Sequence, residues 1–173
     1  MQIKAAIAYK EEPGFHIETV EIEAPRPDEI LVKIAGVGIC HTDLVFSSGA
    51  VPYPFPAVFG HEGSGEVVAV GEDVQKVSVG DHVLITFRSC GTCKRCHDGD
   101  APYCQIMPAL NYTGRRPDGT STMSNEVGAV SSNFFGQSSF ADHCITYERN
   151  VVRVRKDLPI EMLGPLGCGI QTG

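Results

Sequence analysis

The sequence predicts a mainly β fold, and three observations support this prediction. First, 19 glycines and 11 prolines in a chain of 173 residues favour turns over long helices. Second, short segments rich in β-branched and other apolar residues are separated by turn material such as Glu11-Glu12-Pro13-Gly14. Third, apolar and polar residues alternate in Phe15-His16-Ile17-Glu18, as a strand with one buried face requires.

The same patterns place individual elements along the chain. Strands are expected at residues 3–9, 15–22, 30–37, 65–70, 82–87, 141–146 and 151–154. One helical turn is expected at residues 42–46, after Cys40, and another at residues 159–163, where Pro159 suits a first turn. Residues 112–137 are rich in Gly, Ser, Thr and Asn without periodicity, which predicts a long surface loop.

Composition and charge narrow the class of protein. Hydrophobic residues make up 42% of the chain and charged residues 20%, which is ordinary for a domain with a hydrophobic core. No stretch approaches the roughly 20 apolar residues of a membrane span, and acidic residues and Pro13 come too early for a secretion signal. A net charge of -7 disfavours nucleic acid as a partner. We therefore expect a cytoplasmic protein without membrane or nucleic-acid partners.

The cysteines carry the most information about chemistry. An odd number in a chain without a secretion signal argues against a disulfide framework and for thiols that stay reduced. Metal binding is the natural use of such a set. The seven are Cys40, Cys90, Cys93, Cys96, Cys104, Cys144 and Cys168.

Four cysteines lie in one short segment, at Cys90, Cys93, Cys96 and Cys104. Zinc binds four thiolates tetrahedrally, and such a closed site has no position for a substrate, so it is structural. An iron–sulfur cluster and a set of unrelated buried thiols are the alternatives. His97, within this segment, is expected to face solvent.

A second, open site is suggested by three residues that stand beside glycines in distant parts of the chain. These are Cys40, His61 and Cys168. Two thiolates and a neutral imidazole leave the fourth position of a zinc ion free, and that ion can polarise an alcohol oxygen. The alternative is a histidine with ordinary hydrogen bonds and two inert core thiols. Cys144 fits neither set, and we expect a small buried hydrophobic residue there.

The run Gly60-His61-Glu62-x-x-Gly65, with Gly71 further on, resembles the zinc signature of medium-chain, zinc-dependent alcohol dehydrogenases. It occurs in family order with Cys40-His41-Thr42-Asp43, Val79-Gly80-Asp81-His82-Val83, the four-cysteine segment and Gly167-Cys168-Gly169. The resemblance covers essentially the whole chain. It implies that residues 1–173 form a GroES-like catalytic domain, a partly open β-barrel with short helices and a zinc-binding loop.

The resemblance also implies that this domain is incomplete at its C-terminus and that a Rossmann domain, which binds the cofactor, follows Gly173. The last residues, 167–173, have one residue too many between their final glycines for a dinucleotide fingerprint and lack the βαβ context of that motif. We therefore expect no cofactor-binding fold in this chain.

Roles for single residues follow from the resemblance. Cys40, His61 and Cys168 would bind the catalytic zinc ion, and the four-cysteine segment the structural one. Thr42 would accept the alcohol proton, and Asp43 would hold His61 in its ligating tautomer. Taken alone, however, Thr42 and Asp43 could merely cap the short helix.

The same resemblance implies positions and contacts for four more residues. Glu62 would lie behind the zinc ion and modulate its coordination. His41 would contact the cofactor pyrophosphate, Thr172 would pack near the nicotinamide, and Phe87 would line the substrate pocket. Without the resemblance, Glu62 and His41 would be read as surface residues and Phe87 as a core aromatic.

The implied activity is interconversion of alcohols and aldehydes by hydride transfer to NAD, in a full-length enzyme that forms homo-oligomers. Many members carry a histidine five residues after the first ligand, where this chain has Val45. That valine and the ending Gly167–Gly173 most resemble aryl-alcohol (benzyl-alcohol) dehydrogenases, with Val45 in the substrate pocket.

Three alternatives remain. A glutathione-dependent formaldehyde dehydrogenase also carries a run like Pro117–Ser121. A non-enzymatic GroES-like scaffold would keep only the structural zinc, and a redox-sensing protein would use the four cysteines as a thiol switch.

Overall fold

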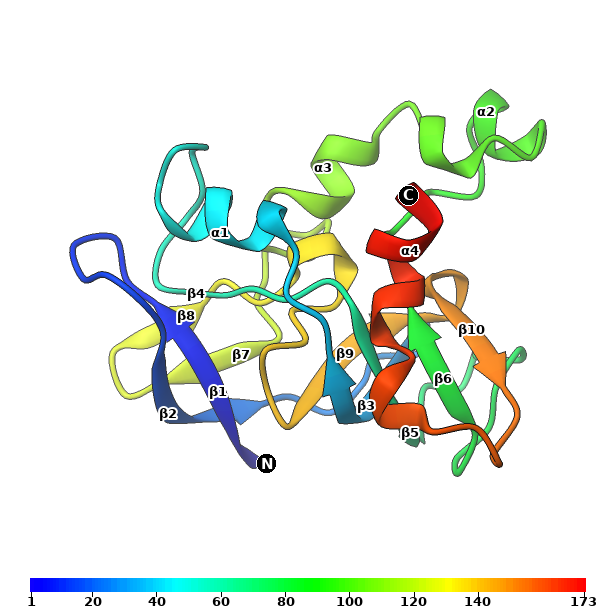
Figure 1. Ribbon diagram of the computed structural model, residues 1–173, viewed down its shortest axis with the longest axis horizontal. Helices are drawn as coiled ribbons and strands as arrows, with labels where there is room; N and C mark the ends of the chain where they lie inside the picture. The colour runs from blue at the N-terminus through cyan, green and yellow to red at the C-terminus, as the bar shows by residue number, and fades with distance from the viewer.

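Two five-stranded antiparallel sheets, with short helices on one side of them, make up the fold in the computed structural model, which describes residues 1–173 (Figure 1). The strands are β1 (Gln2–Ala8), β2 (His16–Ile22), β3 (Glu29–Val37), β4 (Ala57–Val58), β5 (Gly63–Val70), β6 (His82–Ile85), β7 (Met123–Asn125), β8 (Gly128–Val130), β9 (His143–Tyr147) and β10 (Val151–Val154). The helices are α1 (His41–Ser47), α2 (Lys94–His97), α3 (Met107–Asn111) and α4 (Gly169–Thr172), with 3₁₀ turns η1 (Ala101–Tyr103), η2 (Phe134–Gly136), η3 (Glu148–Asn150), η4 (Ile160–Met162) and η5 (Gly164–Gly167).

The two sheets close on each other into a partly open barrel. The strand order is β4-β1-β2-β7-β8 in the first sheet and β10-β6-β5-β3-β9 in the second. Strand β1 joins them, because Ala6 N donates to Phe140 O at 2.8 Å and Asp142 N donates to Lys4 O at 2.9 Å, just before β9. The predicted GroES-like, mainly β fold is confirmed.

Alternation along the strands builds the core. In β1 the side chains of Ile3, Ala5 and Ile7 are buried while Gln2 and Lys4 are exposed. The inward residues of the first sheet meet Leu31 and Ile145 of the second, so one hydrophobic cluster lies between the sheets. Burial of such side chains contributes about 1.5–3 kcal/mol each. This core therefore holds the two sheets together.

The first and last residues of the predicted strands lie within two residues of those in the structure. Strand β6 ends at Ile85 rather than at residue 87, and β9 runs from His143 to Tyr147. The predicted turn after Cys40 is α1, and that at residues 159–163 is the 3₁₀ turn η4. Strands β4, β7 and β8 and helices α2, α3 and α4 were not predicted. No helix is long and apolar enough to cross a membrane.

The expectation of a surface loop at residues 112–137 is wrong. This region contains β7 and β8, and residues 131–137 near its end are all buried except Phe135, which is half-buried. Several of its polar side chains form hydrogen bonds inside the fold, although Ser131 Oγ and Asn133 Oδ1 have no partner. The hydroxyl of Ser132, for example, accepts from Thr122 N and Met123 N at 3.1 and 3.0 Å. Hydrogen bonding, rather than apolar periodicity, holds this segment in the core.

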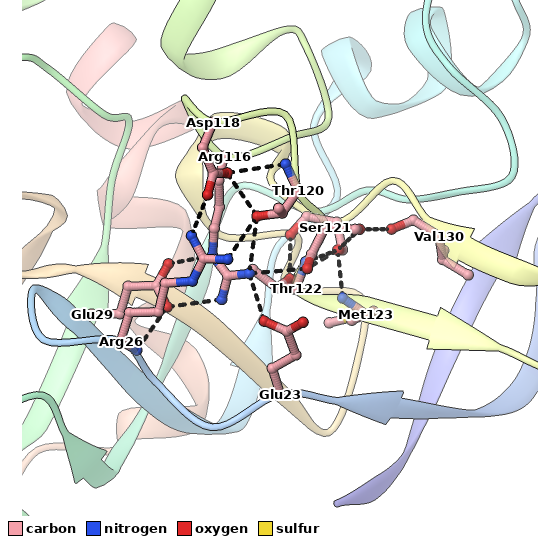
Figure 2. Close-up of polar contacts among 11 residues, drawn as sticks. Glu23, Arg26, Glu29, Arg116, Asp118, Thr120, Ser121, Thr122, Met123 and Val130 are labelled. Carbon is pink, nitrogen blue, oxygen red and sulfur yellow. Dashed lines mark hydrogen bonds and ion pairs between the residues drawn. The ribbon is translucent and has the colours of Figure 1, made fainter.

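A buried arginine anchors the start of the same region (Figure 2). Arg116 forms a two-pronged ion pair with Glu29, with Nε–Oε1 and Nη2–Oε2 distances of 2.6 and 2.9 Å, and its Nη1 lies 2.7 Å from Oε2 of Glu23. Arg116 and Glu29 are 3% and 1% exposed. Figure 2 also shows Arg26 beside Asp118 and Thr120, at 2.7 and 2.9 Å. The region is thereby fixed to the beginning of β3.

Candidate metal centres

The four-cysteine segment folds into a separate lobe, near α2 in Figure 1. The sulfur atoms of Cys90, Cys93, Cys96 and Cys104 all lie within 4.8 Å of one another, and Cys90 Sγ lies 3.8 Å from Cys96 Sγ. Helix α2 begins directly after Cys93, and η1 ends directly before Cys104, so the two short elements bring the later cysteines back to the first. His97 is exposed, as expected, and is not part of the cluster.

Backbone amides point at the sulfur atoms. Thr92 N and Cys93 N donate to Cys90 Sγ at 3.4 and 3.3 Å, and Cys90 N donates to Cys104 Sγ at 3.3 Å. The hydrogen bonds from Thr92 and Cys93 lower the pKa of Cys90 to about 5. Partial burial, together with the neighbouring sulfurs, raises the pKa of Cys96 to about 11. Four thiolates this close need a cation among them, and a tetrahedral zinc ion fits that donor set.

The second cluster combines residues from three distant parts of the chain. Cys40 precedes α1, His61 lies between β4 and β5, and Cys168 lies between η5 and α4. The ligand atoms of Cys40, His61, Glu62 and Cys168 lie within 4.8 Å of one another. The barrel strands and the C-terminal turns thus bring together the three residues predicted as ligands, with Glu62 beside them.

The surroundings of His61 leave one of its ring nitrogens free to bind a metal ion. His61 is 2% exposed, and its Nδ1 lies 2.9 Å from Oδ1 of Asp43. Its other ring nitrogen, Nε2, is buried and has no hydrogen-bond partner. A buried nitrogen without a partner is costly unless something binds it. With Nδ1 engaged by a carboxylate, Nε2 is the atom that a zinc ion would bind, as in other carboxylate–histidine–zinc arrangements.

Asp43 contacts both the start of α1 and the ring of His61. Its Oδ2 accepts from Cys40 N at 2.9 Å and so caps α1, while its Oδ1 accepts from Gly60 N at 3.0 Å and contacts His61. The side chain is fully buried. One carboxylate therefore ties together the backbones that carry two of the predicted ligands.

Burial, hydrogen bonds and neighbouring charges shift the pKa values of the residues in this second cluster. Burial lowers the pKa of His61, but the hydrogen bond and charge of Asp43 outweigh burial and raise it above its ordinary value. Burial, followed by the charge of Cys40, raises the pKa of Cys168 to about 11. Burial alone would raise the pKa of Cys40, but hydrogen bonds from Thr42 and the nearby His61 lower it.

Glu62 is closely surrounded by glycines. Its Oε1 accepts from Gly169 N at 2.9 Å, and its backbone O accepts from Gly38 N at 3.0 Å. A Cβ atom at Gly38 would lie 2.0 Å from Oε2 of Glu62, and one at Gly164 would lie 2.1 Å from its backbone O. Because these positions are glycines, the carboxylate of Glu62 can lie close to Cys40, His61 and Cys168. The sequence motif alone does not reveal this role of the glycines.

A cavity of about 540 Å³ opens on the second cluster. His61, Cys168 and Thr172 form part of its wall, together with Phe87, which was predicted to line the substrate pocket. The lining residues that sequence reasoning missed are Pro102, Tyr103, Met107, Phe135, Gly167 and Gln171. Several of these come from the four-cysteine lobe and α3, so the lobe contributes one wall.

Other predicted residues are near the cluster but not in this wall. Thr42 Oγ1 lies 3.6 Å from Cys40 Sγ, His41 is exposed at the start of α1, and Val45 is half-buried on α1. Val45 is not among the residues that line the cavity. Cys144 is fully buried in the second sheet's core, where burial raises its pKa far above its ordinary value, and belongs to neither cluster.

Comparison with known proteins identifies the class of protein. The model of the alcohol dehydrogenase GroES-like domain matches residues 26–156. Geraniol dehydrogenase from Castellaniella defragrans is 53% identical over 158 residues, which are 91% of this chain and 42% of that protein. S-(hydroxymethyl)glutathione dehydrogenase from Saccharomyces cerevisiae is 37% identical over 171 residues, 98% of this chain and 44% of that protein.

The crystal structure of benzyl alcohol dehydrogenase from Acinetobacter calcoaceticus is 42% identical, with a TM-score of 0.93 over 100% of this chain and 46% of that one. The chain therefore belongs to the alcohol dehydrogenase GroES-like domain family. It spans less than half the length of these relatives.

Proposed function

We propose that this chain is the metal-binding, substrate-facing part of a zinc-dependent oxidoreductase that interconverts primary aromatic or allylic alcohols and aldehydes, with NAD as the hydride acceptor. The observation that carries the proposal is the geometry of His61. Its Nδ1 is held by Asp43, and its buried Nε2 has no hydrogen-bond partner. A ring nitrogen of His61 lies within 4.8 Å of the sulfur atoms of Cys40 and Cys168, beside an open cavity. A protein that served only as a scaffold would not require a buried histidine placed between two thiols in this way.

The two metal sites are assigned different tasks. Cys90, Cys93, Cys96 and Cys104 would hold a structural zinc ion, since four sulfurs leave no position for a substrate. Cys40, His61 and Cys168 would hold the catalytic one, which when bound supplies Lewis-acid polarisation of the alcohol oxygen. Glu62 stands behind this set, held by Gly169 N, and would modulate the coordination.

The residues around the catalytic cluster would handle the proton and the substrate. Thr42 carries a hydroxyl that both donates and accepts hydrogen bonds, next to Cys40, and would receive the alcohol proton. Phe87, Met107 and Phe135 present apolar surface to the cavity, which would hold the apolar part of the alcohol and exclude water. Thr172, in the same wall, would contact the nicotinamide, and the exposed His41 the pyrophosphate.

The aromatic or allylic substrate class is supported by the relatives. Geraniol is an allylic alcohol and benzyl alcohol an aromatic one, and the proteins named for them are more identical to this chain than the glutathione-dependent relative is. The run Pro117–Ser121, which suggested that alternative, is engaged in internal contacts, since Asp118 and Thr120 both bind Arg26. We therefore place formaldehyde and glutathione second.

Further parts of the proposal concern the rest of the protein. The nicotinamide cofactor would be held mainly by a Rossmann domain outside these residues, and the choice between NAD and NADP would be made there. The full-length enzyme would be a homo-oligomer in the cytoplasm, where the seven free cysteines would stay reduced. Small-molecule alcohols and aldehydes would be its partners.

The test is an assay of the full-length protein that contains this chain. Oxidation of benzyl alcohol, geraniol and ethanol is followed with NAD and with NADP, and formaldehyde with glutathione is the fourth substrate. We expect benzyl alcohol or geraniol with NAD to give the highest kcat/KM. Cys40→Ser should abolish turnover, and Cys144→Ala, which alters a thiol outside both clusters, should retain it. Equal activity of the Cys40 variant would refute the proposal, and residues 1–173 alone should be inactive.

A further inference from the structure

The imidazole of His61 lies flat against a side chain that belongs to neither metal cluster. The ring centroids of Phe135 and His61 are 4.4 Å apart and the ring planes differ by 21°. We propose that Phe135 is a positioning residue for the open metal centre, because it fixes the plane of the His61 ring and thereby the direction of Nε2. This inference rests on the proposed function, which assigns a zinc ion to Cys40, His61 and Cys168.

The stack supplies a restraint that Asp43 cannot supply alone. The contact between Asp43 Oδ1 and Nδ1 fixes one edge of the imidazole but leaves the ring able to tilt about that contact. The ring of Phe135, stacked on one face of the imidazole, prevents this tilt. Phe134 lies edge-on to His61 with a centroid distance of 5.7 Å and restricts the imidazole from another direction. Aromatic pairs at these separations attract each other beyond what area burial alone gives.

The backbone of Phe135 adopts a conformation that a bulky residue rarely takes. Its φ angle is +51°, in the left-handed region that is uncommon for residues other than glycine, asparagine and aspartate. Such strain persists only where the surroundings enforce it, and it concentrates at functional sites. Here Asn150 Nδ2 lies 3.5 and 3.4 Å from the carbonyl oxygens of Phe135 and Gly136, and the buried Asn150 holds the turn in place.

The residues that follow Phe135 hold the backbone of His61. Gln137 Nε2 donates to His61 O at 2.9 Å, and Gly63 N donates to Gln137 Oε1 at 3.1 Å. Gln137 is fully buried. Ser138, whose φ is +54°, donates from its hydroxyl to Val58 O at 2.6 Å. Residues 135–138 therefore contact the ring and the carbonyl oxygen of His61, and they also bind the neighbouring strands β4 and β5.

The consequence for metal binding follows from preorganisation. A ligand whose ring is already fixed loses less freedom when it binds, so the affinity is higher than for a ring that must be ordered first. Leucine at position 135 would keep the wall apolar but would not present a flat face. Tyrosine would keep the flat face. The two variants therefore separate the stacking role from the role of Phe135 in lining the cavity.

The experiment measures the affinity of the second zinc equivalent by chelator competition, in the full-length protein whose four-sulfur site is already loaded. Phe135→Leu should raise this Kd by about 2- to 10-fold, the range expected for one aromatic pair. Phe135→Tyr should stay near the parent value. Phe15→Leu is the matched control, since Phe15 packs on Phe140 in a different part of the aromatic cluster, and it should leave the Kd unchanged.

The outcomes separate this inference from the proposed function. A parent protein that takes up only one zinc ion would overturn both. Two zinc ions with an unchanged Kd in Phe135→Leu would overturn the positioning role alone. Should Phe135→Leu fail to fold, NMR of the parent protein decides: the Cε1 proton of His61 should be shifted upfield by the ring current of Phe135, and an ordinary chemical shift would contradict the stack.

Discussion

The Nδ1 atom of His61 lies 2.9 Å from Oδ1 of Asp43, and both side chains are shielded from solvent. On the proposed assignment, the carboxylate would set the tautomer of the ring and leave Nε2 to bind the zinc ion. We predict that Asp43→Asn weakens the second zinc equivalent by about 10- to 100-fold, the usual cost of losing such a partner. Chelator competition measures this.

Asp157→Asn is the control for that substitution, because Asp157 forms an exposed pair with Arg155 far from either cluster. It should leave both zinc affinities unchanged. If Asp43→Asn also left the second affinity unchanged, the tautomer role of Asp43 would be wrong.

The protonation of the open cluster predicts how its zinc affinity depends on pH. Burial, followed by the charge of Cys40, raises the pKa of Cys168 to about 11, so this thiol carries a proton near neutral pH that zinc must displace. The raised pKa of His61 acts in the same direction. Loss of protons on binding means that the affinity increases with pH. Between about pH 6 and pH 8 we expect up to a tenfold decrease in Kd per pH unit for each proton released.

Calorimetry in buffers of different ionisation enthalpy counts the protons released by the second zinc equivalent. A Kd that is constant over this range, or that rises with pH, would contradict the predicted direction.

The ion pair between Arg116 and Glu29 should be essential for the stability of the fold. Both side chains are almost fully buried, so removing Arg116 leaves the Glu29 carboxylate without an opposite charge, with Arg26 N as a remaining hydrogen-bond donor (Figure 2). We expect Arg116→Met to lower the free energy of unfolding by about 3–5 kcal/mol. Arg26→Met removes a half-exposed pair with Asp118 and should cost about 1 kcal/mol or less. Denaturant unfolding followed by circular dichroism measures both.

The double variant Arg116→Met/Glu29→Gln tests the reason for that loss. Since it removes both charges, it should be more stable than Arg116→Met alone. A double variant that is less stable by a further 2 kcal/mol or so would mean that the pair itself, rather than the stranded carboxylate, dominates.

Gly38 should tolerate no side chain. A methyl group there would lie 2.0 Å from Oε2 of Glu62, so the carboxylate must leave its position and Gly169 N loses its acceptor. We expect Gly38→Ala to cost about 1–3 kcal/mol in stability and to reduce turnover of the full-length enzyme. Gly119→Ala is the comparison, since an added methyl there meets nothing within 4 Å. It should affect stability, through its φ of +84°, but not turnover.

Thr42 should matter for the chemical step of the proposed reaction. Its hydroxyl lies beside Cys40, and losing a group that assists proton transfer costs about 10²-fold or more in turnover. We therefore expect this loss in Thr42→Ala and substantial recovery in Thr42→Ser. Equal kcat values for the alanine and serine variants would indicate that the methyl group, not the hydroxyl, is needed.

Val45 is the position where a titratable histidine would be expected in many members of the family. If proton transfer is limited by its absence, Val45→His should change the pH profile of kcat, because imidazole titrates near neutrality. If Val45 instead shapes the pocket, KM for an aromatic alcohol should rise and the pH profile should stay the same. Measuring both for one aromatic and one aliphatic alcohol distinguishes the two.

The sequence predicted the parts of the fold and site that depend on local pattern. The spacing of the four cysteines is readable within a few residues, and their sulfur atoms do lie together. The alternation in Phe15-His16-Ile17-Glu18 correctly indicated a strand, β2, but its buried face was predicted wrongly, because Ile17 is 69% exposed and the buried residues of β2 are Val20 and Ile22. The three dispersed ligand positions needed the family motifs, since no local pattern relates Cys40 to Cys168. The structure brings their side chains together through barrel strands that are far apart in the chain.

What the sequence did not predict depends on partners distant along the chain. Residues 112–137 looked like a surface loop because their polar side chains find hydrogen bonds inside the fold, as Arg116 does with Glu29. Phe135 was missed because its stack on His61 requires a left-handed backbone. One signal was present: Phe134-Phe135-Gly136 is a pair of large apolar residues within a polar stretch, and such residues need a buried place.

The two metal clusters also differ in when each can first exist during folding. Cys90 and Cys104 are 14 residues apart, so a zinc ion can gather the four sulfurs while the rest of the chain is still unfolded. The other cluster draws on Cys40 and Cys168, and the entropy of closing a loop rises with its length. It therefore forms only after the barrel has closed. On the proposed assignment, a newly made chain would load zinc in two stages, the structural ion first and the catalytic ion last.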